Sequence, residues 1–507
     1  MTKKKEILKD AGIYALSSYA AQVLDVFTGI LLRRFLGPAQ MGVWAFLQVI
    51  INYAKHASLG VTSATTRDVP YYLKKGDNEK AEETKNLVFS FTVFSAGVTS
   101  AGVVIFALFK RDVYSKEIFS GLLVVAAIIL LQRIYNLYVV LLRAHKAFVF
   151  AGFLNIFSSV LGLLLALGLA WPFKLIGFFA SVILNYVLCL AVLYWKTPYR
   201  FSFLFSWKKM APLFDLGAAM LVSDVLRTFL ASADRIMIAK FLSFEQLGLY
   251  SIALMANNYL YSLPNMFGVI LFPHFQELYA ERDNPKDLVK YLIKPSLGLA
   301  FLFPLPLALV WIFSHWLVPA FLPDYLDGLA ALKLVILGSF FMALTHPFSN
   351  FLVTVRKHWQ LIPLQILLIA SAYGFSAWFL HEGRGIEGVA LASLITAFLN
   401  FLFFSAASFR ILKLTKGVGL FYFQVILAFA YSTGALASVG WLTRDFSGAH
   451  LGTAFLQSAL FALMALPLMV LAERETGVFK HGWEMLAGRL SKRTPNDLSS
   501  GNTSSEG

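Results

Sequence analysis

Long apolar runs constrain this chain more than any other feature. Hydrophobic residues make up 58% of the 507 residues and charged residues 14%, which is too few charges for the surface of a water-soluble protein of this length. The runs are about 20 residues long, the length of helix that crosses a hydrocarbon core of about 30 Å. Because backbone groups in lipid must be satisfied within each segment, the runs predict an all-α polytopic membrane protein.

We predict about fourteen transmembrane helices from these runs. They are residues 12–32, 41–61, 87–109, 118–142, 148–171, 175–195, 216–240, 247–272, 292–313, 330–354, 361–380, 387–408, 419–441 and 450–472. Lysine and arginine concentrate at the N-terminus and in every second connection, which predicts that both termini are cytoplasmic. This placement explains most of the net charge of +15 without a nucleic-acid partner. We expect membrane lipids to surround the transmembrane helices.

One segment occurs twice, 206 positions apart. Residues 35–54 read FLGPAQMGVWAFLQVIINYA and residues 241–260 read FLSFEQLGLYSIALMANNYL. The shared positions are Phe35, Leu36, Gln40, Gly42, Asn52 and Tyr53, which recur as Phe241, Leu242, Gln246, Gly248, Asn258 and Tyr259. Each copy of this repeated segment connects two apolar runs, which predicts an internally duplicated membrane bundle.

The repeat predicts two six-helix lobes with parallel topology, since spans one and seven cross in the same direction. The N-lobe is 1–195 and the C-lobe is 216–408, joined by a basic, aromatic cytoplasmic linker at 196–215. Residues 409–472 add spans thirteen and fourteen. Residues 473–507 are expected to form a cytoplasmic amphipathic helix followed by a disordered tail.

Charged residues inside the spans are the candidate functional residues. In span seven Asp224, Arg227 and Asp234 lie at i, i+3 and i+10, so Arg227 and Asp234 share a helix face and Asp224 is close to it. A charge near the middle of a span costs at least about 2.5–3.5 kcal/mol against lipid. This face is therefore expected to face protein or a hydrated cavity. Asp224 and Arg227 could alternatively form a structural ion pair.

Further polar side chains lie in spans one, two, four and eight. The candidates are Asp25, Asn52, Lys55, His56, Arg133 and Asn258. Lys55 could reach the cytoplasmic surface, Arg133 could hold neighbouring helices together, and Asp25 could neutralise a basic residue. As a set, the cations suit an anionic head group, since guanidinium groups offer forked donors to phosphate oxygens.

Motifs of catalysis are missing from the sequence. It contains no HExxH, Walker loop, GxGxxG or GxSxG pattern, and its histidines lack metal-ligand spacing. We therefore expect a transporter, not an enzyme, with no cofactor and no metal. Without a nucleotide-binding loop, transport would depend on an ion gradient (H⁺ or Na⁺), on the membrane potential or on a substrate gradient, and Asp25 is the candidate ion site.

Three stretches resemble a known superfamily. FLGPAQMGVWAF, ADRIMIAKFLSFEQLGLYSIA and GRGIEGVALASLI are similar to the multidrug/oligosaccharidyl-lipid/polysaccharide exporters, and specifically to their polysaccharide-export or O-antigen flippase branch. The resemblance covers about residues 10–410. It implies two six-helix lobes around a central cavity that opens alternately to each face of a bacterial inner membrane.

The same resemblance implies a substrate and roles for the charged residues. The substrate would be an undecaprenyl-pyrophosphate-linked oligosaccharide, moved from the cytoplasmic to the outer leaflet, with a polysaccharide polymerase or another assembly protein as a partner. Arg133, Arg227 and Lys55 would hold the pyrophosphate. Independently of the resemblance, we hypothesise that Asp224 and Asp234 set the charge state of the site and help gating.

Other functions remain open at this point. A cation-coupled multidrug antiporter of the same superfamily would have an acidic or apolar cavity. A flippase for lipid-linked peptidoglycan precursors would typically carry arginines within spans one and two, whereas here Arg33 and Arg34 lie at the end of span one. A non-transporting assembly platform or a lipid-modifying enzyme would belong to different classes of protein.

Overall fold

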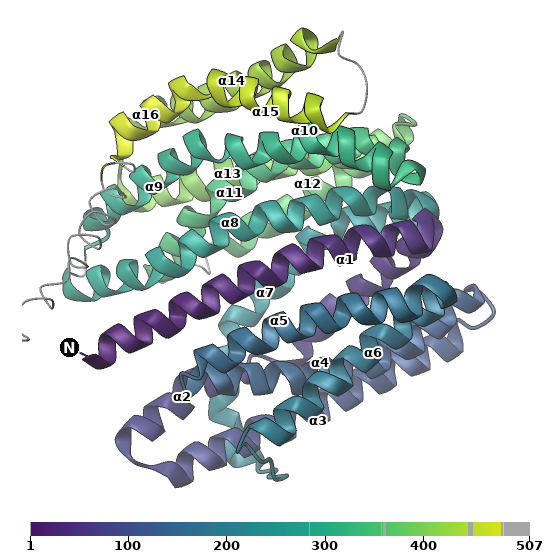
Figure 1. Ribbon diagram of the computed structural model, residues 1–507. Coiled ribbons are helices and arrows are strands. Elements are labelled where there is room, and N and C mark those ends of the chain that lie inside the picture. Colours follow the sequence, from purple (N-terminus) through teal and green to yellow (C-terminus); the bar gives the residue numbers. More distant parts are fainter. Residues whose placement is uncertain are drawn as a thin grey trace, which may run out of the picture. The chain divides into compact units, whose positions relative to one another are not determined.

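The computed structural model describes residues 2–282, 284–355, 357, 361–444, 450–477 and 480, and within these ranges the chain forms helices and no strand (Figure 1). The first helices are α1 (Thr2–Ala54), η1 (Lys55–Ser58), α2 (Thr62–Lys75), α3 (Asn78–Phe109), α4 (Lys116–Ala144), α5 (Phe148–Leu165), η2 (Ala166–Ala170), α6 (Trp171–Lys196) and α7 (Trp207–Phe241).

The remaining helices are α8 (Phe244–Arg282), η3 (Pro285–Leu288), α9 (Val289–Leu302), α10 (Pro304–Phe321), η4 (Pro323–Gly328), α11 (Leu329–Thr354), α12 (Ile362–His381), α13 (Gly385–Leu412), α14 (Val418–Leu442), α15 (Leu451–Met464) and α16 (Leu466–Thr476). The predicted all-α fold is confirmed. Most of the predicted tail, 473–507, lies outside the described residues.

The described helices overlap every predicted span. Nine helical segments among the described residues are long and apolar enough to cross a membrane, and the bent pair α15–α16 makes a tenth. Two of the nine, Gly12–Ser58 and Phe148–Lys196, are 47 and 49 residues long, about twice the ~20 residues that one crossing needs. Each holds two predicted spans. Predicted spans seven and eight correspond to α7 and α8, which have more polar sequences.

Backbone breaks divide the two longest segments where the sequence predicts connections. Inside α1, Gly37 has φ 72° and ψ 173° and is followed by Pro38. Glycine adopts this positive φ without the steric penalty of a side chain, and proline is favoured where a new helix starts. Inside α6, Lys174 has φ 51° and ψ −130°, and its Nζ donates a hydrogen bond of 3.0 Å to Phe35 O. This hydrogen bond therefore joins the break in α6 to the chain two residues before the break in α1.

The two copies of the repeated segment contact each other reciprocally. A Cβ atom added to Gly42 would lie 1.6 Å from Phe244 O, and one added to Gly248 would lie 1.7 Å from Pro38 O. Gly42 and Gly248 are equivalent positions of the repeat, and so are Pro38 and Phe244. The glycine of each copy therefore touches the same backbone position of the other copy. We call this contact the glycine crossing, and only residues without a side chain allow backbones to approach so closely.

Two compact units make up the chain, and each is described by itself. The first comprises Met1–Ser262, Phe313–Ser339 and Arg356–Phe403, and the second Leu263–Ile312, Phe340–Val355 and Phe404–Gly507. In the first unit α1 packs against α5, and α4 packs against α3 and α6, which Figure 1 shows as neighbouring helices. The glycine crossing also lies within the first unit.

Aromatic rings fill part of the second unit. Phe409 packs against Phe348 and Phe421, with ring centroids 5.6 Å and 5.4 Å apart. Phe429 of α14 packs against Phe341 of α11 at 4.7 Å. These contacts join α11, α13 and α14 within this unit.

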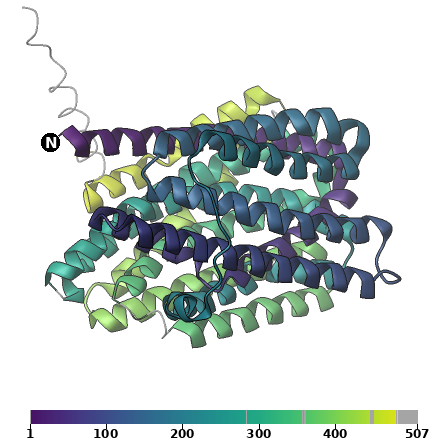
Figure 2. The same cartoon turned by 90° about the horizontal axis from the view of Figure 1, so that it is seen from below.

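The segment between α6 and α7 is extended and lies against α3. Ser202 N–H donates to Asn86 Oδ1 at 3.2 Å, and Leu204 N–H donates to Ser90 Oγ at 2.8 Å. The Phe201 ring stacks on Phe89 with centroids 4.5 Å apart. In Figure 2 this segment is the teal trace that crosses the neighbouring helices. Since α7 already begins at Trp207, the second half of the predicted linker 196–215 is helical.

Candidate functional site

Two predicted basic residues lie where α1 ends. The α-helix stops at Ala54, and a short 3-10 turn, η1, carries Lys55 and His56. Lys55 Nζ donates to Asn52 Oδ1 at 2.8 Å. His56 Nε2 lies 2.7 Å from Thr228 Oγ1 of α7, so this hydrogen bond joins the end of α1 to α7. Predicted span two, 41–61, therefore ends as an α-helix several residues early, and its last polar residues are on a turn.

Arg133 comes to the same place from α4. Its side chain is only 9% exposed, and its guanidinium donates to Ala54 O, the last carbonyl of α1. Helix-terminal carbonyl groups lack partners within the helix, so this contact satisfies one of them. Arg133 thus holds α4 against α1, as the structural alternative predicts. It also brings a buried positive charge next to Lys55, with which it interacts electrostatically.

Arg227 and Asp224 form an ion pair, which is the structural alternative given above for these two residues. Arg227 Nη2 and Asp224 Oδ1 are 2.9 Å apart, and the two side chains are 67% and 51% exposed. The pair is therefore far more exposed than Arg133. His56 interacts electrostatically with both members of the pair and with Arg133 and Lys55. Six of the predicted residues thus lie together, and we call them the basic cluster: Asn52, Lys55, His56, Arg133, Asp224 and Arg227.

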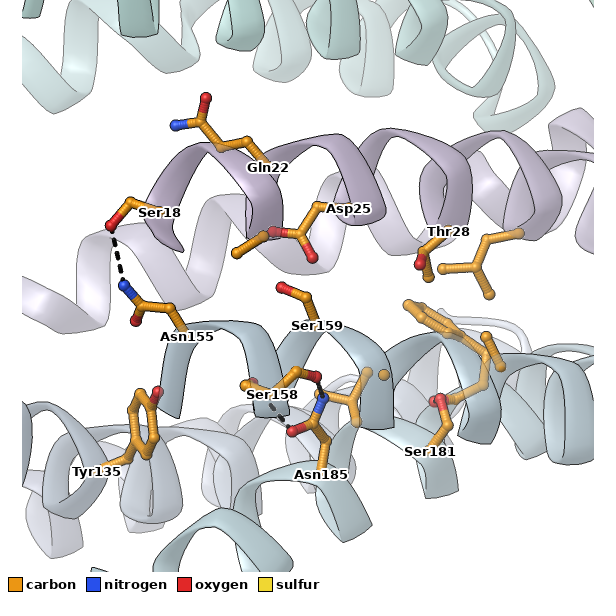
Figure 3. Close-up of a pocket in the computed structure, with 16 residues that line it drawn as sticks. Ser18, Gln22, Asp25, Thr28, Tyr135, Asn155, Ser158, Ser159, Ser181 and Asn185 are labelled. Atoms are coloured by element: carbon orange, nitrogen blue, oxygen red, sulfur yellow. Dashed lines mark hydrogen bonds between the residues drawn. The ribbon is translucent and has the colours of Figure 1, made fainter. Parts of the chain in front are cut away.

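Asp25 lies elsewhere, in a cavity of about 450 Å³. The cavity is bounded by α1, α4, α5 and α6, and Figure 3 shows Asp25 directed toward Ser159 of α5. Most of its polar lining consists of neutral hydrogen-bonding side chains: Ser18, Gln22, Thr28, Tyr135, Asn155, Ser158, Ser159, Ser181 and Asn185. Asp25 is the one acidic residue in the described lining.

Hydrogen bonds hold much of this lining in place. Asn155 Nδ2 donates to Ser18 Oγ at 3.1 Å, which joins α5 to α1. Ser158 Oγ donates to Asn185 Oδ1 at 3.1 Å, and Asn185 Nδ2 donates to Ser158 O at 3.0 Å, which joins α5 to α6. The side chains around Asp25 are thus largely fixed before any ligand enters.

Asp234 and Asn258 make different contacts from the residues of the basic cluster. The Asp234 carboxylate accepts a hydrogen bond of 2.7 Å from the backbone N–H of Arg235, and it interacts electrostatically with Tyr373 of α12. Asn258 lines a second cavity, of about 310 Å³, together with Arg33 and Arg235. Groups of three or more potential metal-binding side chains are absent from the described part of the chain.

The two arginines of the second cavity were not among the candidates from sequence. Arg33 was assigned to the end of span one, where an arginine usually reaches the interface. Instead it is 8% exposed, and its Nη2 donates to Ser251 O at 2.9 Å. A usable signal was its place just before the first copy of the repeated segment, because Ser251 of the second copy accepts its hydrogen bonds.

The all-α fold, with polar cavities enclosed by apolar helices, is that of a polytopic membrane protein. The structure of the lipid II flippase MurJ in an inward closed conformation matches it with a TM-score of 0.68 at 16% identity, covering 91% of this chain and 98% of MurJ. An inward-facing MATE family multidrug transporter of the MOP superfamily matches with a TM-score of 0.63 at 15% identity, covering 78% of this chain and 96% of the transporter.

Sequence comparison shows the family. The model of the polysaccharide biosynthesis protein family matches residues 31–327, and the chain belongs to this family. It is also 23% identical over 421 residues to a Shigella flexneri protein named "Putative O-antigen transporter", covering 78% of this chain and 96% of that protein. The predicted superfamily resemblance is confirmed.

Proposed function

We propose that the protein moves an undecaprenyl-pyrophosphate-linked oligosaccharide from the cytoplasmic to the outer leaflet of a bacterial inner membrane by alternating access. The family, the named function of the Shigella relative and the flippase-like fold support this proposal. Both termini would be cytoplasmic, and the protein would act beside a polysaccharide polymerase or another assembly protein. The protein would be a transporter, not an enzyme.

The observation that carries the proposal is the basic cluster. Lys55, Arg133 and Arg227 come from η1, α4 and α7, and Asp224 is the single carboxylate among them. The excess positive charge suits a pyrophosphate, because guanidinium groups donate forked hydrogen bonds to phosphate oxygens. An organic cation, the cargo of the antiporter alternative, would be repelled at the same place.

The remaining predicted residues complete the proposed mechanism. Asn52 and His56 would contact the head group beside Lys55, and Asn258 would contact it farther along. Asp224 would release Arg227 when the anion arrives, since a carboxylate and a phosphate compete for the same guanidinium. Asp234, next to Arg235, would act in gating. Asp25 would bind the coupling ion, H⁺ or Na⁺.

Deletion of the gene tests the function. A strain without the protein is expected to accumulate lipid-linked oligosaccharide on the cytoplasmic face and to lose surface polysaccharide, because the lipid-linked head group cannot cross the bilayer unaided. Accessibility of the glycan in everted and right-side-out vesicles measures its location. Normal surface polysaccharide combined with hypersensitivity to organic cations would instead support the antiporter, and rescue of a strain depleted of its lipid II flippase would support the peptidoglycan alternative.

Asp25→Asn tests the coupling site. The substitution keeps the size and shape of the side chain, removes its charge and replaces one acceptor oxygen with an N–H donor. We expect transport driven by an imposed H⁺ or Na⁺ gradient in proteoliposomes to fall by about tenfold or more, since a charge-assisted contact is worth about 1.5–3 kcal/mol, whereas exchange without a gradient persists. Asp112→Asn, in the exposed turn between α3 and α4, is the matched control. Unchanged gradient-driven transport in Asp25→Asn would exclude this residue from coupling.

A further inference from the structure

The second cavity lies between the two copies of the repeated segment, next to the glycine crossing. Its volume is about 310 Å³. One side is formed by α1, including Met41 immediately before Gly42, and the other by α8, from Ser251 to Ser262. Arg235 of α7 and Phe178 of α6 complete the lining. All of these residues belong to the first compact unit.

Arg33 is a buried cation in this cavity without an acidic partner. Its guanidinium donates to Ser251 Oγ at 3.2 Å, to Ser251 O at 2.9 Å and to Gly29 O at 2.9 Å. These acceptors are all neutral, and no ion pair involves Arg33 in the ranges that the structure describes. Neutral acceptors satisfy the N–H groups but leave a net positive charge away from water, which is costly until an anion binds.

Arg235 adds a second positive group with an unused donor. Its Nε is buried and has no hydrogen-bond partner. The adjacent Asp234 interacts with it electrostatically, but one oxygen of that carboxylate accepts the backbone N–H of Arg235. A buried donor without an acceptor is uncommon and points to a missing ligand or water.

The rest of the lining fits a phosphorylated ligand. Gln48 and Asn258 carry amide groups, Trp44 and Tyr259 carry aromatic rings, and none of the described lining residues is acidic. A cavity of this size is large enough for a pyrophosphate or a sugar phosphate. Arg235 also interacts electrostatically with Lys55 of the basic cluster, so the two positive regions are neighbours.

We propose that this cavity is a second anion subsite, in which Arg33 and Arg235 bind a phosphate or pyrophosphate group. The proposal deepens the proposed function and rests on it for the identity of the cargo: the head group would pass from the basic cluster to this subsite beside the glycine crossing. The same chemistry would also fit the head group of an anionic phospholipid, and the experiment separates these two sources.

Binding stoichiometry tests the subsite. Full-length protein in phosphatidylcholine nanodiscs is dialysed against radiolabelled pyrophosphate, and we expect two molecules bound per chain. Arg33→Gln combined with Arg235→Gln should remove one bound pyrophosphate, and Lys55→Gln combined with Arg227→Gln should remove the other.

Arg34→Gln is the matched control, because Arg34 is adjacent to Arg33 but exposed. It should leave both sites intact. Since Arg33 also holds α1 to α8, Arg235→Gln alone is included and should weaken one site by about tenfold.

Several outcomes would overturn the proposal. They are unchanged stoichiometry and affinity in the Arg33/Arg235 and Arg235 variants, or no pyrophosphate binding to the wild-type protein. Phosphatidylglycerol in the nanodiscs could abolish binding of one pyrophosphate to the wild-type protein but not to the Arg33/Arg235 variant. In that case the subsite binds lipid head groups, and the proposed passage of the cargo head group from the basic cluster to the subsite is wrong. The deletion phenotype is measured separately. Loss of export in the deletion strain together with normal binding in the Arg33/Arg235 variant would refute this subsite while leaving the proposed function intact.

Discussion

Gly42→Ala and Gly248→Ala are each expected to reduce strongly the amount of folded protein and its transport. In both cases the new Cβ would fall within 2 Å of a backbone carbonyl oxygen, at 1.6 Å for Gly42 and 1.7 Å for Gly248. A backbone oxygen cannot rotate away as a side chain can, so two helices must separate. Overpacking of this kind costs about 1–3 kcal/mol or more. Thermal unfolding in detergent and transport in proteoliposomes measure the effect.

The chain contains a matched control for this test. Gly102 of α3 has no atom within 4 Å of its hypothetical Cβ, so Gly102→Ala adds the same methyl group without a clash. Because alanine favours helix by up to about 1 kcal/mol over glycine, this variant should be neutral or slightly more stable. The double variant Gly42→Ala/Gly248→Ala should cost less than the sum of the single variants, because the first substitution already separates the helices. Full additivity would contradict a shared crossing.

Arg227→Gln and Arg133→Gln are expected to abolish most export but to differ in their effect on stability. Arg227 is in an exposed pair, and such pairs contribute about 0–1 kcal/mol, so its variant should unfold near the wild-type temperature. Arg133 is buried and binds the last carbonyl of α1, so its variant should also be destabilised. In both variants, loss of a charged donor should lower transport at least about tenfold.

Conservative and control substitutions separate the two roles of these arginines. Arg133→Lys keeps the charge but replaces the planar guanidinium group. Compared with Arg133→Gln, it should restore transport more than stability. Arg143→Gln, an exposed arginine of the same helix α4, should leave both properties unchanged. If Arg227→Gln and Arg133→Gln both export at the wild-type rate, the basic cluster does not bind the substrate.

Much of the fold could be predicted because the features that determine it are local in the sequence. A run of about 20 apolar residues must be a helix in lipid, and the Gly37–Pro38 connection is visible as a glycine and a proline between two runs. The α1 end at Ala54 was less visible, because Lys55 and His56 follow an apolar stretch that still fits a span. Those two side chains lie on a turn, which sequence periodicity does not distinguish from one more helical turn.

The candidate site could be predicted in part. Deep charges must face protein or water, so Arg133 and Arg227 could be selected without knowing their neighbours. Which helices face one another depends on their rotation, which the sequence does not show. Asp234 is also separated from Asp224 by ten residues, which is about 15 Å along α7. The residues that line the Asp25 cavity could not be identified from the sequence, since serine and asparagine are also common where membrane helices pack against one another.

The reciprocity of the glycine crossing also bears on the origin of the chain. When one surface touches a second copy of itself so that position i meets j and j meets i, the interface is isologous, the kind found in symmetric dimers. Gly42 against Phe244 and Gly248 against Pro38 is this pattern. A half-length ancestor could therefore have made the same contact between two separate subunits, needing glycine at only one position of its sequence. In a fused chain the two halves of such an interface can diverge independently, and Arg33 indeed corresponds to Ala239.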